Sequence, residues 1–197
     1  MAKKQKKVVV DSKWLRDVAK LIHDGHSGKY LRLCTGTLQN GPDPVDSVRT
    51  MHCGLGELYF QLTGRQPEED GVNEDDVVSE CLDRTVLADP DAKADELDLQ
   101  LRKTLTKELK AIKAVKLDEY AIADIVDTAV STAVDAARDE AEEKAQEFRD
   151  VLNQIPDIND LTGASTQDEG AVCSMGDFKA RSKAVAALLR EAAALLP

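Results

Sequence analysis

The side chains best suited to catalysis or metal binding lie in the first half of the chain. They are types that bind zinc or form a nucleophile and its base: His23, His26, Cys34, His52, Cys53 and Cys81. Zinc sites usually take paired ligands two to four residues apart at both ends, and here only His23 and His26 approach that spacing. Cys53 and Cys81 lie on or beside apolar helical stripes, where a free thiol behaves as a small buried hydrophobe. The spacing therefore predicts no metal centre and no cofactor.

A thiol nucleophile needs an imidazole beside it, oriented by a third polar group. His52 and Cys53 are neighbours in the sequence, but adjacent residues of a helix point about 100° apart. His52 therefore cannot activate Cys53 within one helix. Glu57 could supply a carboxylate for acid–base work, although carboxylates are usually only solvated. We predict no catalytic residue, and a small enzyme or metal protein that uses His52 and these cysteines stays as an alternative.

Two glycines interrupt the most regular apolar stripe of the chain, which predicts a helix from about Val48 to Leu62. Inside a helix each glycine costs roughly 1 kcal/mol relative to alanine. Gly54 and Gly56 therefore predict that another backbone comes very close. We expect that neighbour to be the first predicted helix, near Val18.

The same region carries a resemblance to a known family. The segment Met51-His52-Cys53-Gly54-Leu55-Gly56-Glu57-Leu58-Tyr59, preceded by an amphipathic helix, resembles a family of small uncharacterised bacterial and phage proteins. The resemblance covers roughly residues 13–65. This chain has Glu57 where that family's motif has alanine, and it lacks the family's Trp-x-Gln-Gly-x-x-Ala-Arg-Asp loop. The resemblance implies a helical fold and a bacterial or phage origin, and it implies no activity.

The elements that must position these residues are helices. Aromatic residues make up only 4% of the chain, so leucine, valine, isoleucine and alanine must fill the core, which suits helix packing. Apolar periodicity and capping residues predict an all-α fold of about six helices. They are expected at 12–24, 48–62, 74–88, 91–117 and 118–154, with a last helix after Asp177. The break at Asp118, with Asp118 as the cap, is placed because one unbroken helix from Asp91 to Ile155 would be roughly 100 Å long.

The composition changes near residue 90, and this change predicts the domain organisation. Residues 1–11 read as a basic flexible tail, residues 12–89 as a compact N-terminal helical domain, and residues 90–197 as long Ala-rich helices packed as a hairpin or bundle. Pro156 is expected to end the fifth helix and to begin a loop over 156–176. A strand-like stretch at 29–34 lies inside a long loop over 25–44.

The fifth predicted helix carries a seam of small apolar residues. Its members recur at an average step of 3.75 residues, close to the 3.6 of a straight helix: Ile122, Val126, Ala129, Ala133, Ala137, Ala141, Ala145, Phe148 and Leu152. The alanines let a second helix axis come close. The seam therefore predicts a helix–helix contact, either with the fourth or last helix of this chain or with a helix of another chain.

Charge and hydropathy narrow the class of protein. The formal charge is −11, which repels phosphate backbones, and only the tail with Lys3, Lys4, Lys6 and Lys7 favours nucleic acid. No apolar run approaches the ~20 residues that a membrane span needs. We therefore expect a protein of the bacterial cytoplasm or of a phage particle that acts through protein partners or self-association. The alternatives are the enzyme or metal protein above and a nucleic-acid-associated protein that uses the lysine tail.

Overall fold

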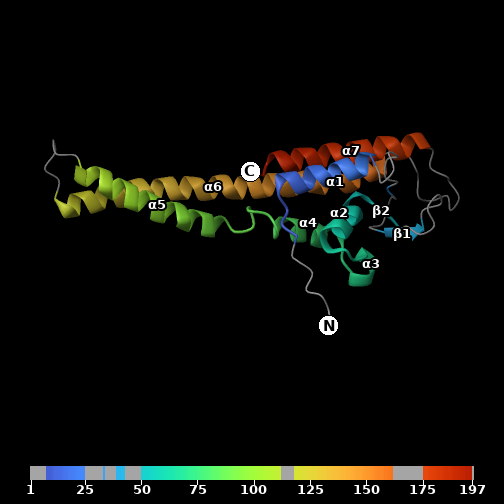
Figure 1. Cartoon of the computed structure of the whole chain (residues 1–197), viewed down its shortest axis with the longest axis horizontal. Helices are drawn as coiled ribbons and strands as arrows, with labels where there is room; N and C mark the ends of the chain where they lie inside the picture. The colour runs from blue at the N-terminus through green and yellow to red at the C-terminus, as the bar shows by residue number, and fades with distance from the viewer. Residues whose placement is uncertain are drawn as a thin grey trace. The chain divides into compact units, whose positions relative to one another are not determined.

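The computed structural model describes residues 8–24, 33, 39–42, 50–111, 118–161 and 175–196. Within these residues seven helices are present, together with one pair of short strands (Figure 1). The helices are α1 (Ser12–Asp24), α2 (Gly54–Thr63), α3 (Pro67–Asp70), α4 (Glu74–Leu82), α5 (Pro90–Ala111), α6 (Glu119–Leu161) and α7 (Met175–Ala194). The predicted all-α fold class is confirmed.

The chain packs as two units, and their limits differ from the predicted domains. Unit 1 takes the chain up to Val86 and again from Gln146, whereas unit 2 is Leu87–Ala145. Residues from Gln146 onward were expected with the long helices. They pack instead with the N-terminal residues, because α7 lies along α1 and the two helices bury complementary apolar stripes: Leu15, Val18 and Ile22 on α1, and Val185, Leu188 and Leu189 on α7.

The ordered start of unit 1 lies before the predicted first helix. Val10 is buried, and its N–H donates to the carbonyl of Arg84 at 2.9 Å. Asp11, rather than Ser12, caps α1, because its Oδ1 accepts the N–H of Trp14 at 2.6 Å. The prediction of a flexible tail over residues 1–11 is therefore wrong for Val10 and Asp11. The lysines at 3, 4, 6 and 7 lie outside the described residues.

The predicted second helix begins later than its apolar stripe suggested. Strand β2 (Thr50–His52) pairs antiparallel with β1 (Gln39–Pro42), so Met51 is extended rather than helical. Cys53 then caps α2, because its Sγ accepts the N–H of Gly56 at 3.3 Å. The helix ends at Gly64, whose φ of 70° is the left-handed conformation that glycine adopts without strain. Of the predicted strand at 29–34, the structure describes Leu33, which forms a parallel bridge with His52.

Helix α4 begins at Glu74, where the third predicted helix begins, and Asn73 caps it. The Asn73 side chain accepts the N–H of Asp76, and the Asp76 carboxylate accepts the N–H of Asn73, each at 2.9 Å. This reciprocal arrangement satisfies two N–H groups that would otherwise lack partners. The helix ends at Leu82, earlier than expected, and the chain continues through turns toward α5.

Unit 2 is built from α5 and the first part of α6. The predicted break is confirmed, because Asp118 Oδ1 accepts the N–H of Ala121 at 2.8 Å at the start of α6. The core consists of three buried α6 residues, with four partly buried residues packed against them: Ile122, Val126 and Val130, and then Leu101, Leu105, Leu109 and Val134. Ion pairs of Arg102 with Asp127 and of Arg138 with Asp91 also join the two helices.

Pro156 does not end the helix in which it lies. Helix α6 continues through it to Leu161, so the first residues of the predicted loop at 156–176 are helical. An internal proline removes one backbone hydrogen bond, but Leu152 and Ile155 are fully buried just before it and hold this part of the helix in the core of unit 1. None of the described helices has the length and apolar character needed to cross a membrane.

Candidate functional site

Gly54 lies very close to two other helices, but the neighbouring atoms belong to side chains and not to the backbone that was expected. A Cβ atom added at Gly54 would lie 2.5 Å from Ile155 Cγ2 and 2.9 Å from Val185 Cγ1. The contact is therefore with side chains of α6 and α7 rather than with the backbone of α1 near Val18. Gly56 is buried in the first turn of α2, where its N–H is bound to Cys53.

The apolar seam of α6 is present but follows a slightly different path. Ala141 and Phe148 are buried, and Ala137 and Ala145 are half-buried. Ala129 and Ala133 are exposed, so they do not take part in the contact with α5 of the same chain. Val130 and Val134 occupy the seam in place of these alanines. A buried valine removes more apolar area from water than a buried alanine does. Within unit 2 the seam faces α5 of the same chain, where Ala137 and Ala141 lie opposite Ala94 and Leu97.

His52 is the centre of a buried polar network that joins β2 to α2. Its Nδ1 lies 3.0 Å from Glu57 Oε2, and its Nε2 lies 2.6 Å from Gln66 Oε1. The amide of Gln61 donates to the other Glu57 oxygen at 2.7 Å. His52 is 3% exposed and Glu57 is fully buried. The ring of Phe60 stacks on His52 with centroids 5.2 Å apart.

This network has a structural role. A ring that is covered on its face and bonded at both nitrogens cannot meet a dissolved substrate, but it fixes α2 against the strand pair. Arg181, which is buried on α7, extends the same support by donating to the Leu33 carbonyl at 2.7 Å. Sequence reasoning singled out His52 and Glu57 separately. Their pairing depends on a strand-to-helix turn at Cys53. This turn was not predicted, because the apolar stripe indicates one continuous helix there.

The two described cysteines are free thiols, and both are buried. Cys53 is not paired with His52: its sulfur accepts the Gly56 N–H, whereas the His52 ring bonds to Glu57 and Gln66. Burial raises the pKa of the Cys81 thiol to about 12, and the neighbouring Glu80 adds to this rise. Cys34, Cys173 and His26 lie outside the described residues. In the part of the chain that the structure describes, no three His, Cys, Asp or Glu side chains gather as a metal site would require.

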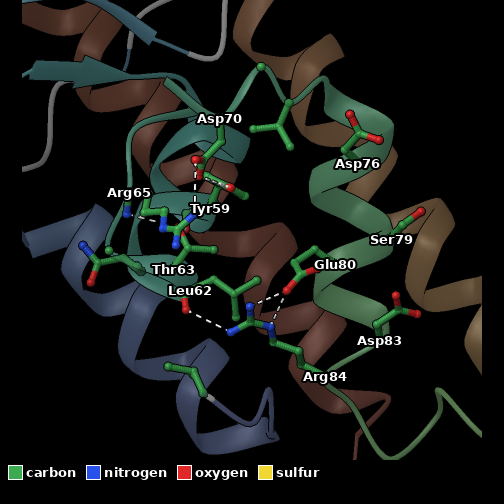
Figure 2. Close-up of a pocket in the computed structure, with 15 residues that line it drawn as sticks. Tyr59, Leu62, Thr63, Arg65, Asp70, Asp76, Ser79, Glu80, Asp83 and Arg84 are labelled. Carbon is green, nitrogen blue, oxygen red and sulfur yellow. Dashed lines mark hydrogen bonds and ion pairs between the residues drawn. The ribbon is translucent and has the colours of Figure 1, made fainter. Parts of the chain in front are cut away.

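A polar groove of about 930 Å³ lies between α2 and α4 (Figure 2). On its α2 side, Asp70 accepts the Tyr59 hydroxyl at 2.6 Å and pairs with Arg65 at 3.3 Å. Burial raises the pKa of Tyr59, and its bond to Asp70 adds to this rise. On the other side, Arg84 pairs with Glu80 and donates to the Leu62 carbonyl at 3.1 Å. These groups satisfy one another, and the described wall carries neither histidine nor cysteine.

Unit 2 has exposed apolar side chains on both of its helices. Five large apolar side chains are exposed among the described residues, and three of them belong to this unit: Leu99 at 70%, Tyr120 at 88% and Ile125 at 44%. Helix α5 buries only Ala94, and its four inward leucines, at 97, 101, 105 and 109, stay half-buried. Two helices have one mutual interface, so the rest of each helix surface faces away from the other. The hairpin α5–α6 (Leu87–Ala145) is therefore the candidate contact surface.

Comparison with protein families, with curated proteins and with solved structures found no match to this chain.

Proposed function

We propose that this is a non-catalytic bacterial or phage protein that works through contacts with other protein chains, as an assembly component or as an accessory factor that occupies a host protein. The hairpin α5–α6 carries the contact surface. The resemblance of residues 13–65 to small bacterial and phage proteins supports the origin.

The observation that carries this proposal is the unequal burial of the two units. Unit 1 has a core of fully buried side chains, among them Leu15, Leu58 and Leu189. In unit 2, α5 buries a single alanine and leaves Leu99 largely exposed. We take the exposed apolar residues of this unit, Leu99 on α5 and Tyr120 and Ile125 on α6, as its protein-binding surface. The chemistry-bearing side chains of unit 1 support the same function, because His52 and Cys81 are enclosed in its core.

Site-specific photo-crosslinking in the native host tests the proposal. A photoreactive phenylalanine analogue replaces Leu99, Tyr120 or Ile125 in the full chain, and the matched control carries it at the exposed Lys13 of α1. We expect defined protein adducts from the three hairpin positions and none from Lys13. If the hairpin positions form no adduct with any protein chain, this one included, the proposed function is wrong. Adducts with nucleic acid instead of protein would favour the lysine-tail alternative.

A further inference from the structure

Helix α7 has a cationic outer face, although the chain as a whole is acidic. Of the exposed side chains that the structure describes on α7, three are basic and one is acidic: Lys179, Lys183, Arg190 and Glu191. Lys179 and Lys183, the lysine pair, are four residues apart, so they lie about 6 Å apart along the same side of the helix. Exposed alanines continue this face: Ala180, Ala187 and Ala194. The outer face of α7 therefore combines positive charge with side chains small enough for a second helix to come close.

The ion pairs among the described residues do not include the lysine pair. Arg190 differs, because it lies close enough to Asp24 of α1 to lower the pKa of that carboxyl, after the larger effect of the hydrogen bond from His23. The helix dipole favours basic residues in the last turn of a helix, and α7 has none there. Neither ion pairing within the described fold nor the dipole therefore accounts for the two lysines.

Within unit 2, the side of α6 that faces away from α5 carries the opposite charge. Asp139 and Glu143, the carboxylate pair, are exposed and are also four residues apart. Each lies two positions from the buried Ala141, which faces α5, and two positions on a helix correspond to about 200°. The carboxylate pair is therefore on the opposite side of α6. The two basic residues of this part of the helix, Arg138 and Lys144, are already in ion pairs within unit 2.

We infer that the outer face of α7 binds the outer side of α6 in a second copy of this chain. This inference rests on the proposed function, because α6 belongs to the hairpin, and it names the partner. The lysine pair and the carboxylate pair have the same spacing of about one helical turn, so an antiparallel arrangement of the two helices joins both pairs at once. The same arrangement brings Ala187 close to the exposed Ala136 of the other copy, where small side chains allow close packing.

Charge favours a second copy over a nucleic acid as the partner. The net charge of −11 repels a phosphate backbone at long range, whereas α6 offers two carboxylates at the spacing of the lysine pair. The contact joins two different faces, so it either closes into a ring of copies or continues as a chain of copies. Exposed ion pairs stabilise little. The association is therefore weak, and it increases with protein concentration.

Charge reversal on each face, followed by mixing, tests the inference on the full chain. The α7 variant is Lys179→Glu with Lys183→Glu. The α6 variant is Asp139→Lys with Glu143→Lys. Molar mass is measured by sedimentation from about 1 to 200 µM protein at about 0.1 M salt, where screening over about 10 Å limits charge effects to faces in contact. We expect the wild type to associate and each variant alone to associate at least about tenfold more weakly, because like charges replace opposite ones.

An equimolar mixture of the two variants should associate again, because the α7 variant keeps a native α6 and the α6 variant keeps a native α7. The mixture separates lost contact from lost folding, since misfolded variants would not associate. Matched controls carry the same changes of net charge at other exposed positions. Lys103→Glu with Lys107→Glu on α5 matches the α7 variant. Glu68→Lys with Glu69→Lys on α3 matches the α6 variant, and both controls should associate like the wild type.

A wild type that stays monomeric over the whole concentration range overturns the second-copy inference. A mixture that stays monomeric does the same, as does a control that weakens association as much as the variant it matches. The photoreactive analogue at Ala136 adds a readout without charge reversal: in a mixture of isotopically light and heavy chains, its adduct should join one chain to α7 of another. Adducts within single chains alone would contradict the inference. The proposed function survives these failures if the crosslinked hairpin positions still bind a different protein, so the two failures can be told apart.

Discussion

The histidine at position 52 shows how one residue fixes a junction. Both of its ring nitrogens face side-chain oxygens, one on Glu57 and one on Gln66, and its ring is almost fully buried. A buried carboxylate such as that of Glu57 is tolerated only while its hydrogen bonds are made. His52 therefore matters to stability through the partner that it satisfies.

Replacing His52 by leucine should lower the free energy of unfolding by about 2–4 kcal/mol, because Glu57 loses a hydrogen-bond partner in the core. Chemical denaturation of the single variants and of the His52→Leu, Glu57→Leu double variant measures the coupling. We expect the double variant to lose less than the sum of the two single losses. Strictly additive losses would show that the two side chains do not depend on each other.

Ionisation of the Cys81 thiol makes the free energy of unfolding depend on pH in the alkaline range. Burial raises its pKa from an ordinary 9.0 to about 12, so the folded chain holds a proton that the unfolded chain releases. The contribution is complete below pH 9 and is lost as the pH rises toward 12. Tyr59, whose pKa is also raised by burial, acts in the same direction.

The free energy of unfolding should therefore fall between pH 9 and 12. In Cys81→Ala the slope should be shallower by about 1.4 kcal/mol per pH unit, the value for one proton. Urea denaturation at a series of pH values measures both slopes, with Ser79→Ala on the exposed face of α4 as the control. Equal slopes for the wild type and the cysteine variant would mean that the Cys81 thiol ionises normally in the folded chain.

At the scale of elements, Gly54 allows α2, α6 and α7 to meet. Gly54→Ala should lower the free energy of unfolding by about 1–3 kcal/mol, because the new methyl group overlaps Ile155 and Val185. Ile155→Ala removes the nearest atom, so the double variant should recover part of the loss caused by the alanine at 54. Thermal denaturation provides the comparison. If Gly54→Ala melts like the wild type, the three helices do not meet this closely.

The cap of α6 can be tested in the same way. Asp118→Ala removes the acceptor for the Ala121 N–H and should destabilise the start of the helix by about 1 kcal/mol, whereas Asp118→Asn keeps an acceptor and should cost less. Hydrogen exchange of the amides at 119–122 reports on this end of α6. Equal exchange in the two variants would show that the carboxylate does not act as the cap.

The sequence predicted elements where the local pattern was unambiguous. The starts of α4 and α6 were predicted because a capping residue, Asn73 or Asp118, stands directly before each helix. The start of α2 could not be predicted in this way. Val48 and Met51 have the spacing of the helical stripe, but strand pairing with β1 decides the conformation of residues 50–52. Pro156 predicted the end of a helix that in fact continues, because the tertiary packing of Ile155 outweighs a local helix breaker. The contact of His52 with Glu57 depends on the strand-to-helix turn at Cys53, and no local sequence pattern indicated it.

At the scale of the whole molecule, the backbone amides of the two units should differ in their protection from hydrogen exchange. Helix α5 has one buried residue, whereas α1 buries Leu15, Val18, Ala19 and Ile22. Local opening requires less exposure of apolar surface in α5, so its amides should exchange with deuterium faster than those of α1. Mass spectrometry of peptides from the two helices measures this in one experiment. Equal exchange in the two helices would contradict the expected difference.

The packing of α7 along α1 also has a consequence for folding during synthesis. Synthesis delivers α1 first and α7 after all the other helices, and closing so long a loop is entropically costly. The hairpin of unit 2 needs only neighbouring segments, so it folds early, as local contacts generally do. Until α7 emerges from the ribosome, Leu15, Val18 and Ile22 lack the helix that covers them. The nascent chain therefore has an exposed apolar helix throughout this interval, and translation pauses or chaperone binding would act there.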